Sequence, residues 1–129
     1  MNTKAIKGRQ GEEYAAEYLR SKGFAILEMN FSFRQGEIDI IAQNDAYIVF
    51  TEVKTRSSSP LVSGVEAVNP AKRRRIVLAS MHYLASHVSK LQPRFDVIEV
   101  NIRRGEAFVP LGLNHIENAF GAEIENASF

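Results

Sequence analysis

The chain has 129 residues, close to the commonest size for one domain, which is enough for one hydrophobic core and too few for two. Its apolar fraction of 45% and charged fraction of 24% are those of an ordinary globular protein, and the lack of cysteine excludes disulfides and cysteine-ligated zinc. The net charge of +1, from 16 basic and 15 acidic residues, excludes the overall basic excess of a protein that coats DNA.

The first half of the chain predicts a helix followed by three strands. Ala15, Ala16 and Leu19 recur at helical spacing and Gly23 ends the pattern, which predicts a helix over 8–21. Apolar and β-branched runs then predict strands over 23–29, 37–43 and 47–55, separated by a polar turn over 30–36 and a hairpin turn at Asn44 and Asp45. The Ser-rich stretch 56–63 is expected to form a loop.

A second helix is predicted from its first residues. Asn69 is a favoured N-cap residue and Pro70 takes the first helical position, and the apolar spacing continues to about Ser89. The rest of the chain predicts a strand over 95–102, a short strand over 107–111 and a last helical turn over 114–120. Asp96 in RFDVIEV is interpreted as a partner of Arg94 or a structural hydrogen-bonding group rather than as a catalytic residue.

This order of elements predicts an α/β fold with a mixed sheet and a helix on each face. The three strands joined by short turns should meander antiparallel, and the strand–helix–strand unit after them suggests a parallel crossover. No repeat or linker divides the chain. It is expected to form a single domain, with a core over about 8–111 and a C-terminal tail over about 112–129.

A pair of charges interrupts an apolar strand. Side chains alternate along IVFTEVKT, so Glu52 and Lys54 share one face with Ile48 and Phe50. A lone charge on a buried face is costly unless it is paired or binds a metal. Asp39 lies in the preceding strand EIDIIAQ, and a turn of about two residues would make the strands neighbours. Asp39 and Glu52 are therefore expected to approach one another.

Glu12 is expected to join them from the first helix, because it shares a face with the apolar stripe that ends at Leu19. Such carboxylates bind Mg²⁺ or Mn²⁺, because hard cations prefer oxygen ligands. The metal lowers the pKa of a bound water, and a lysine beside it can orient or deprotonate that water and stabilise charge on phosphorus. The pattern predicts a metal-dependent nuclease with metal ligands Asp39, Glu52 and Glu12, and with Lys54 as the catalytic lysine.

A structural interpretation competes with this site. Glu52 and Lys54 could form an ion pair that protects a strand edge, and for an isolated pair that would be the better interpretation. Asp39 in the neighbouring strand and Glu12 on an inward helix face reverse that preference. Glu37, in contrast, is interpreted as an exposed strand start.

Five segments carry a resemblance that covers most of the chain. GRQGEEYAAEYL, FRQGEIDIIA, VFTEVKTR, NPAKRRR and RFDVIEV, in this order, resemble the YraN (UPF0102) family of bacterial proteins. Its motifs are similar to those of the PD-(D/E)XK nuclease superfamily, which includes archaeal Holliday-junction resolvases and restriction enzymes. The resemblance implies a restriction-endonuclease-like three-layer α/β/α fold with a central mixed sheet.

The same resemblance implies a role for each residue of the site. It implies that Asp39 is the metal-binding aspartate, Glu52 the second metal carboxylate and Lys54 the catalytic lysine. Glu12 would correspond to the glutamate on the N-terminal helix of the resolvases. The proline in the superfamily's name does not precede the aspartate here, where Ile38 stands instead.

Several basic residues are candidates for contacts with nucleic acid. Positive charge in the first turns of a helix opposes the helix dipole, and binding phosphates would offset that cost. The alternative is a solvated basic face with partners such as Glu66. The candidates are Lys72, Arg73, Arg74 and Arg75 at the start of the second helix, Arg56 after the strand that carries Glu52, and Arg34 in the turn before Asp39.

Three functions stay open from the sequence. The first is a DNA endonuclease, acting on branched or damaged DNA; the second is a nucleic-acid-binding module with little activity; the third is a protein-interaction adaptor. A homodimer would bring together two sites, as cutting two strands requires. The N-terminus lacks the apolar stretch of a secretory signal and no run approaches a membrane span, so a cytoplasmic location without membrane contact is expected.

Overall fold

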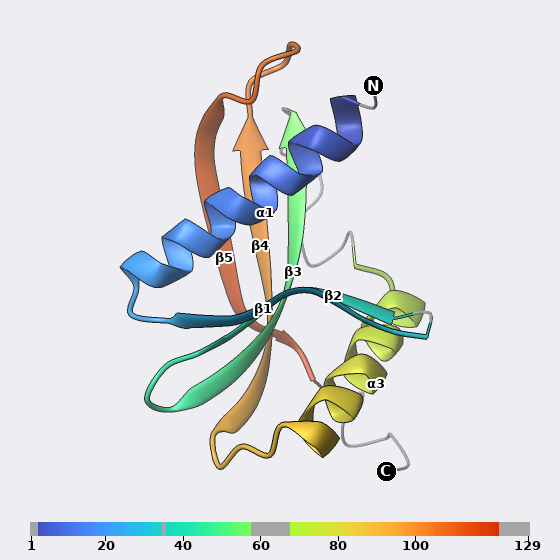
Figure 1. Ribbon diagram of the computed structural model, residues 1–129. Coiled ribbons are helices and arrows are strands. Elements are labelled where there is room, and N and C mark those ends of the chain that lie inside the picture. Colours follow the sequence, from blue (N-terminus) through green and yellow to red (C-terminus); the bar gives the residue numbers. More distant parts are fainter. Residues whose placement is uncertain (1–2, 35, 58–67, 122–129) are drawn as a thin grey trace.

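The computed structural model describes residues 3–34, 36–57 and 68–121. Neither helix in this part of the chain is long and apolar enough to cross a membrane. The described elements, in chain order, are α1 (Thr3–Ser21), β1 (Ala25–Phe33), β2 (Gly36–Gln43), β3 (Tyr47–Ser57), α3 (Pro70–Ser86), β4 (Gln92–Ile102) and β5 (Pro110–Phe120) (Figure 1).

The described strands form one mixed sheet in the order β1-β2-β3-β4-β5. β1, β2 and β3 pair antiparallel, as the predicted meander requires. β3 and β4 pair parallel and α3 lies between them in the chain, which confirms the predicted crossover. β5 pairs antiparallel with β4. The fold is α/β, consistent with a restriction-endonuclease-like domain.

A hydrophobic cluster on each face of the sheet makes the three layers. On one face the buried side chains of α1, among them Ala15, Ala16 and Leu19, pack against the sheet. On the other face Ile76, Val77 and Ala79 of α3 pack against it. The sheet residues of the first cluster are Ile40, Ala42, Val49, Val53, Ile98, Val100 and Ile102, and those of the second include Ile38, Ile41, Ile48, Phe50, Phe95 and Val97.

β2 changes direction at Asp39. In a flat strand residues two apart share a face, yet Ile38 packs in the cluster with α3 and Ile40 in the cluster with α1. On the neighbouring strand Asn30 has a φ of 55°, a left-handed conformation that favours such a local turn of the backbone. The β1–β2 hairpin beyond this point curves over α3 (Figure 1). Asp39 therefore lies between one residue that packs on the α3 side of the sheet and one that packs on the α1 side.

Two glycines allow the helices to approach the sheet closely. A Cβ on Gly11 would lie 1.9 Å from Oγ1 of Thr55. Only glycine therefore allows the backbone of α1 to contact β3 at this residue. A Cβ on Gly36 would lie 2.6 Å from the carbonyl oxygen of Arg75, which places the β1–β2 hairpin directly on α3. The first contact fixes α1 relative to β3, the strand that carries Glu52 and Lys54, and the second fixes α3 relative to β2.

The second helix follows the sequence prediction at its start. The side chain of Asn69 accepts a hydrogen bond from the backbone N–H of Lys72 at 2.9 Å, and Pro70 occupies the first turn. The hairpin turn between β2 and β3 is also confirmed, because Asn44 Oδ1 accepts hydrogen bonds from the N–H groups of Ala46 and Tyr47. α3 ends at Ser86, three residues before the expected end at Ser89.

The turn predicted over 30–36 is wrong for most of its length. β1 continues to Phe33, because the polar positions alternate with Phe31 and Phe33, whose rings pack against the core beside α3. The chain turns only at Arg34, which has a φ of 54°. Of the predicted Ser-rich loop, Arg56 and Ser57 belong to β3, and the rest lies outside the described residues.

The helical turn predicted over 114–120 is also wrong. Pro110–Phe120 is a strand, with Pro110 as its first residue, where a missing N–H does least harm to the pairing. Pairing with β4 satisfies the backbone of this segment, and Ile116 and Phe120 pack on the α3 side. The sheet thus continues through Phe120, past the point near 111 where the core was expected to end.

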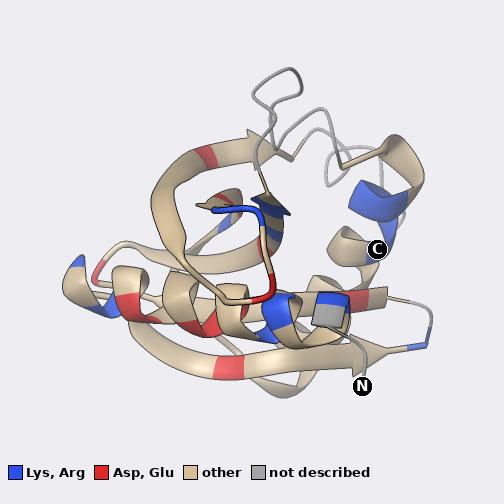
Figure 2. Ribbon diagram, turned by 90° about the horizontal axis from the view of Figure 1, so that it is seen from above, with Lys and Arg blue, Asp and Glu red and all other residues tan. Residues whose placement is uncertain are grey.

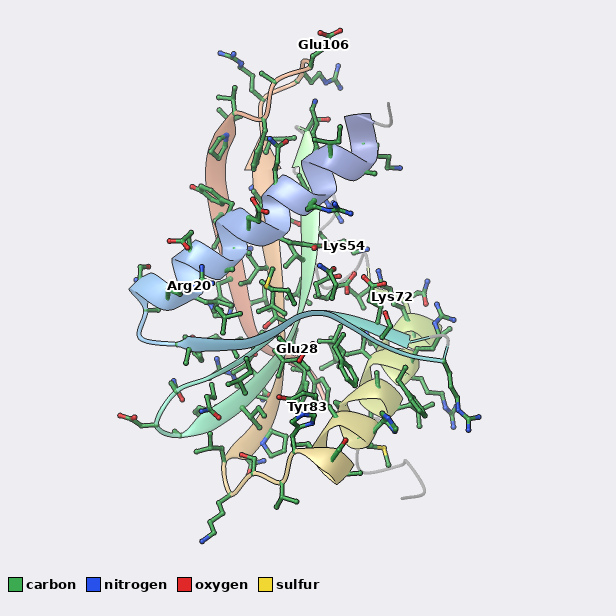
Figure 3. The ribbon with its side chains drawn as sticks, viewed as in Figure 1. Arg20, Glu28, Lys54, Lys72, Tyr83 and Glu106 are labelled. Carbon is green, nitrogen blue, oxygen red and sulfur yellow. The ribbon has the colours of Figure 1, made fainter. Side chains whose placement is uncertain are left out.

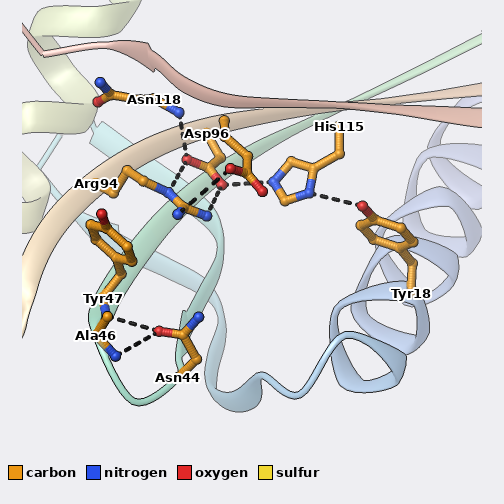
Figure 4. A network of polar contacts seen from close by, with 9 residues as sticks. Tyr18, Asn44, Ala46, Tyr47, Arg94, Asp96, His115 and Asn118 are labelled. Atoms are coloured by element: carbon orange, nitrogen blue, oxygen red, sulfur yellow. Dashed lines mark hydrogen bonds and ion pairs between the residues drawn. The ribbon is translucent and has the colours of Figure 1, made fainter.

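A buried polar network fastens β5 to β4 and to α1 (Figure 4). Asp96 accepts two hydrogen bonds from the guanidinium of Arg94, at 2.9 and 2.8 Å, and one from the backbone N–H of Asn118. His115 Nε2 lies 2.7 Å from Asp96 and its Nδ1 lies 3.0 Å from the hydroxyl of Tyr18. The structural interpretation of Asp96 is confirmed, because these partners satisfy its buried charge.

Candidate active site

Asp39 and Glu52 lie beside each other on the neighbouring strands β2 and β3. Ile40 pairs with Thr51, so Asp39 and Glu52 occupy the next position on the two adjacent strands. Their exposed fractions are only 9% and 4%. Asp39 Oδ2 accepts a hydrogen bond from the backbone N–H of Val53 at 2.8 Å, and a further hydrogen bond joins the Asp39 and Glu52 carboxyl groups. The predicted approach of these two side chains is confirmed.

The surroundings of Asp39 disfavour its negative charge. Burial, followed by the charge of Glu52 and then that of Glu12, raises the pKa of Asp39 to about 8, against the lowering effect of the Val53 N–H. Two carboxyl groups joined by a hydrogen bond must share a proton. The pair therefore requires positive charge between its members, which a proton or a metal cation can supply.

Two lysines provide positive charge beside Glu52 (Figure 3). Nζ of Lys54, two residues along β3, lies 3.5 Å from Glu52 Oε1. Lys72, from the first turn of α3, forms a closer ion pair with the same oxygen. The sequence predicted Lys72 as a contact for nucleic acid, and the structure places it inside the carboxylate cluster. Its role depends on how α3 packs against β3, which no local pattern reveals.

The two lysines differ in how readily they lose a proton. Burial, together with the neighbouring Lys72, lowers the pKa of Lys54, although Glu52 acts in the opposite direction. Burial alone would also lower the pKa of Lys72, but its hydrogen bond with Glu52 and the charge of that group raise it overall. Lys54 is therefore the more suitable of the two for exchanging a proton, and Lys72 the more permanent cation.

Glu12 lies beside the pair without being joined to it. Its side chain is half-buried and receives a hydrogen bond from Asn30. Burial raises the pKa of Glu12, and the charges of Glu37 and Glu52 act in the same direction. Glu12 thus adds negative charge to the site from α1, and its role as a metal ligand stays a prediction.

The site opens through a cavity of about 250 Å³ on the α3 side, the carboxylate cavity. It is lined by Glu37, Asp39, Glu52, Lys72, Arg75 and Ile76. Glu37 was interpreted as an exposed strand start; it is exposed, and it also lines this cavity. The signal for Glu37 was its position two residues before Asp39, which places both side chains on one side of β2.

The donor set of the site fits Mg²⁺ or Mn²⁺ in one specific way. Among the residues that the structure describes, no three acidic, histidine or cysteine side chains are grouped closely enough to hold an ion between them. Mg²⁺, however, is usually bound by one or two carboxylates and keeps waters or phosphate oxygens as its other ligands. Asp39 and Glu52 would supply those two carboxylates, and the raised pKa of Asp39 shows that positive charge beside it is favoured.

The remaining basic candidates lie in different surroundings. Arg56 faces Glu99, with 3.6 Å between their charged atoms. The Nε of Arg73 donates to the carbonyl oxygen of Val68. Arg34, Arg74 and Arg75 are exposed, and Arg75 also lines the carboxylate cavity. The structure thus brings Lys72 and Arg75 to the site and leaves contact with nucleic acid as a prediction for all of them.

Comparison with known proteins places this site in a family. Residues 11–100, which include Glu12, Asp39, Glu52, Lys54 and Lys72, match the sequence profile described as "Uncharacterised protein family UPF0102". A UPF0102 protein of Caldanaerobacter subterraneus is 46% identical over 93% of this chain and 98% of its own length. One of Chlorobium chlorochromatii is 42% identical over 95% of this chain and 96% of its own length. The chain therefore belongs to the UPF0102 family.

Proposed function

We propose that this protein is a metal-dependent nuclease that hydrolyses phosphodiester bonds in DNA. The observation that supports the proposal is the buried pair Asp39 and Glu52, which is joined by a hydrogen bond, lines an open cavity and has Lys54 beside Glu52. A purely structural ion pair would not need a second carboxyl group at its centre, since that group raises the cost of burying charge.

Each side chain of the site has a role in such a reaction. Asp39 and Glu52 would hold Mg²⁺ or Mn²⁺, which when bound activates a water and neutralises charge on the phosphate. The hydrogen bond from the Val53 N–H fixes the orientation of the Asp39 carboxylate. Lys54 lies beside the pair with a lowered pKa, so it can accept a proton from the attacking water and then stabilise negative charge on phosphorus. Glu12 would increase the attraction of the site for a cation.

Cleavage of labelled DNA tests the proposal. Purified protein is incubated with single-stranded, duplex and branched DNA in Mg²⁺, in Mn²⁺ and in chelator. We expect cleavage only with a divalent cation, and its loss in Asp39→Asn. Lys54→Met should reduce the rate by about a hundredfold or more, the usual effect of removing a group that transfers a proton.

Matched variants show whether the losses are specific to the site. Asp45→Asn makes the same chemical change in the exposed hairpin turn, and Lys90→Met does so on the exposed surface. Both should cleave like the wild type. Binding of DNA without cleavage would favour a binding module instead. Neither binding nor cleavage, together with no effect of Mn²⁺ on thermal stability, would favour a protein-interaction adaptor.

A further inference from the structure

A second hollow adjoins the carboxylate cavity. It has a volume of about 350 Å³ and lies between the β1–β2 hairpin and α3; we call it the hairpin pocket. The residues that line it are Phe33, Arg34, Gly36, Arg75 and Leu78. Arg75 lines both this pocket and the carboxylate cavity, so the two hollows are neighbours.

The walls of the hairpin pocket combine an apolar surface with positive charge. The ring of Phe33 is held in place by His82, which stacks on it at 3.7 Å. Leu78 leaves 45% of its surface exposed beside it. The guanidinium of Arg34 lies 5.3 Å from the centre of the Phe33 ring, and Arg75 is exposed at the opposite wall. A flat apolar group that carries negative charge complements these walls in both respects.

The pocket is built by two elements that cannot separate easily. Gly36 lies against the backbone of Arg75, so closely that a single added carbon would overlap its carbonyl oxygen. The hairpin and α3 also share the hydrophobic cluster that contains Phe31 and Tyr83. The pocket is therefore formed in advance of any ligand, which reduces the entropy lost on binding.

We propose that the hairpin pocket binds one unpaired nucleotide of the nucleic acid that the active site cleaves. The base would rest against Phe33 and Leu78, and its phosphates would contact Arg34 and Arg75. Aromatic side chains bind unpaired bases of any sequence by stacking, whereas a base in a duplex already stacks on its neighbours. This inference rests on the proposed function and specifies its substrate class: nucleic acid with at least one unpaired base next to the cleaved bond.

Binding experiments without divalent cation separate this pocket from the catalytic step. Fluorescence anisotropy measures the affinity for a short labelled single strand, for the same strand with an abasic position at its centre, and for a blunt duplex. The wild type should bind the intact single strand about tenfold more tightly than either of the others, the usual scale of one base stacking on an aromatic ring. Phe33→Leu, which keeps an apolar side chain, should remove that difference.

A second variant avoids any effect on the core. Leu78→Asp places a negative charge in the pocket from an exposed position and should weaken binding of the single strand about tenfold. Leu111→Asp is its matched control, because Leu111 is 64% exposed on β5 and the change in charge is the same. Tyr14→Leu removes an exposed aromatic ring from α1 and controls for Phe33→Leu.

The outcomes distinguish the pocket from the function of the whole site. If Leu78→Asp and Leu111→Asp weaken binding equally, or if the abasic strand binds as well as the intact one, the pocket does not hold a base. Retained cleavage in Mn²⁺ would then leave the proposed function standing. If the wild type neither binds nor cleaves any nucleic acid, both proposals fail together.

Discussion

At the scale of single residues, the site is dominated by the cost of placing two carboxyl groups side by side. Asp39 is almost fully buried and Glu52 adjoins it, so each ionised group raises the free energy of the other. The positive charges of Lys72 on α3 and Lys54 on β3 offset part of this cost. The carboxyl pair therefore lowers the stability of the fold and at the same time attracts a cation, a compromise often found at functional sites.

The first prediction concerns Asp39 and pH. An unfolded carboxyl loses its proton near pH 3.8, whereas folded Asp39 keeps it to about pH 8, so folding takes up a proton between these values. The free energy of unfolding should fall as pH rises through this window. Asp39→Asn, which keeps an acceptor for the Val53 N–H, should stabilise the cation-free protein at pH 8 by at least about 1 kcal/mol, or about 3 °C in Tm.

Thermal unfolding of both proteins in chelator, from pH 4 to pH 9, checks this prediction. The two curves should meet near pH 4 and separate as pH rises. Asp45→Asn, in an exposed turn, should change little at any pH. A wild type that is as stable as Asp39→Asn at pH 8 would contradict the raised pKa of Asp39.

The second prediction concerns competition for Glu52. The ammonium of Lys72 is paired with the same carboxylate that would bind a divalent cation. Lys72→Ala should therefore bind Mn²⁺ about fivefold more tightly, since removing a nearby positive charge lowers the repulsion of the metal. Calorimetric titration measures this, with Arg74→Ala on the exposed side of the same helical turn as control. Equal or weaker binding of Mn²⁺ by Lys72→Ala would show that Lys72 does not compete.

At the scale of elements, the position of α1 depends on its contact with β3. Gly11 lies against Thr55 at a distance that leaves no room for a side chain, and Glu12 follows it directly. Whatever moves α1 away from β3 also moves Glu12 away from Asp39 and Glu52. The helix is thus part of the site through its backbone as well as through its glutamate.

The third prediction follows from this contact. Gly11→Ala should destabilise the protein by about 1–3 kcal/mol, because the added methyl group overlaps Thr55 and α1 must shift. Gly8→Ala, in the same helix, meets no atom within 4 Å and should be neutral or stabilise by up to about 1 kcal/mol, as alanine favours helices. Urea unfolding measures both variants. A gain of similar size in both would mean that helix propensity, rather than the contact with β3, decides the result.

The sequence predicted those features of the fold and site that depend on local spacing. Strand alternation placed Glu52 and Lys54 together, and the short hairpin turn placed Asp39 beside them. Lys72 could not be assigned to the site in the same way, because its contact depends on the packing of α3 across the sheet. β5 was mistaken for a helical turn at its end because it owes its conformation to pairing with β4 and to partners such as Asp96. Tertiary contacts outweighed local propensity there.

At the scale of the whole molecule, positive charge is distributed unevenly although the net charge is only +1. Figure 2 shows that the basic start of α3 and the basic end of β1 lie toward the same side as the N-terminal part of α1. The carboxylate cavity and the hairpin pocket both include residues of this side. A polyanion attracted to the molecule would therefore be held next to the site rather than spread over its surface.

The last prediction tests this distribution by the salt dependence of binding. Neutralising Arg34, Arg74 and Arg75 together to glutamine should reduce the slope of log affinity against log salt by about 2, since each phosphate contact contributes about 0.7 to 0.9. The same number of charges removed at Arg20, Lys90 and Arg103, which are exposed elsewhere, should leave the slope within about 0.5 of the wild type. Anisotropy titrations of DNA at several salt concentrations measure both. Equal slopes in the two triple variants would mean that only net charge matters, and the alignment of basic residues with the site would then have no part in binding.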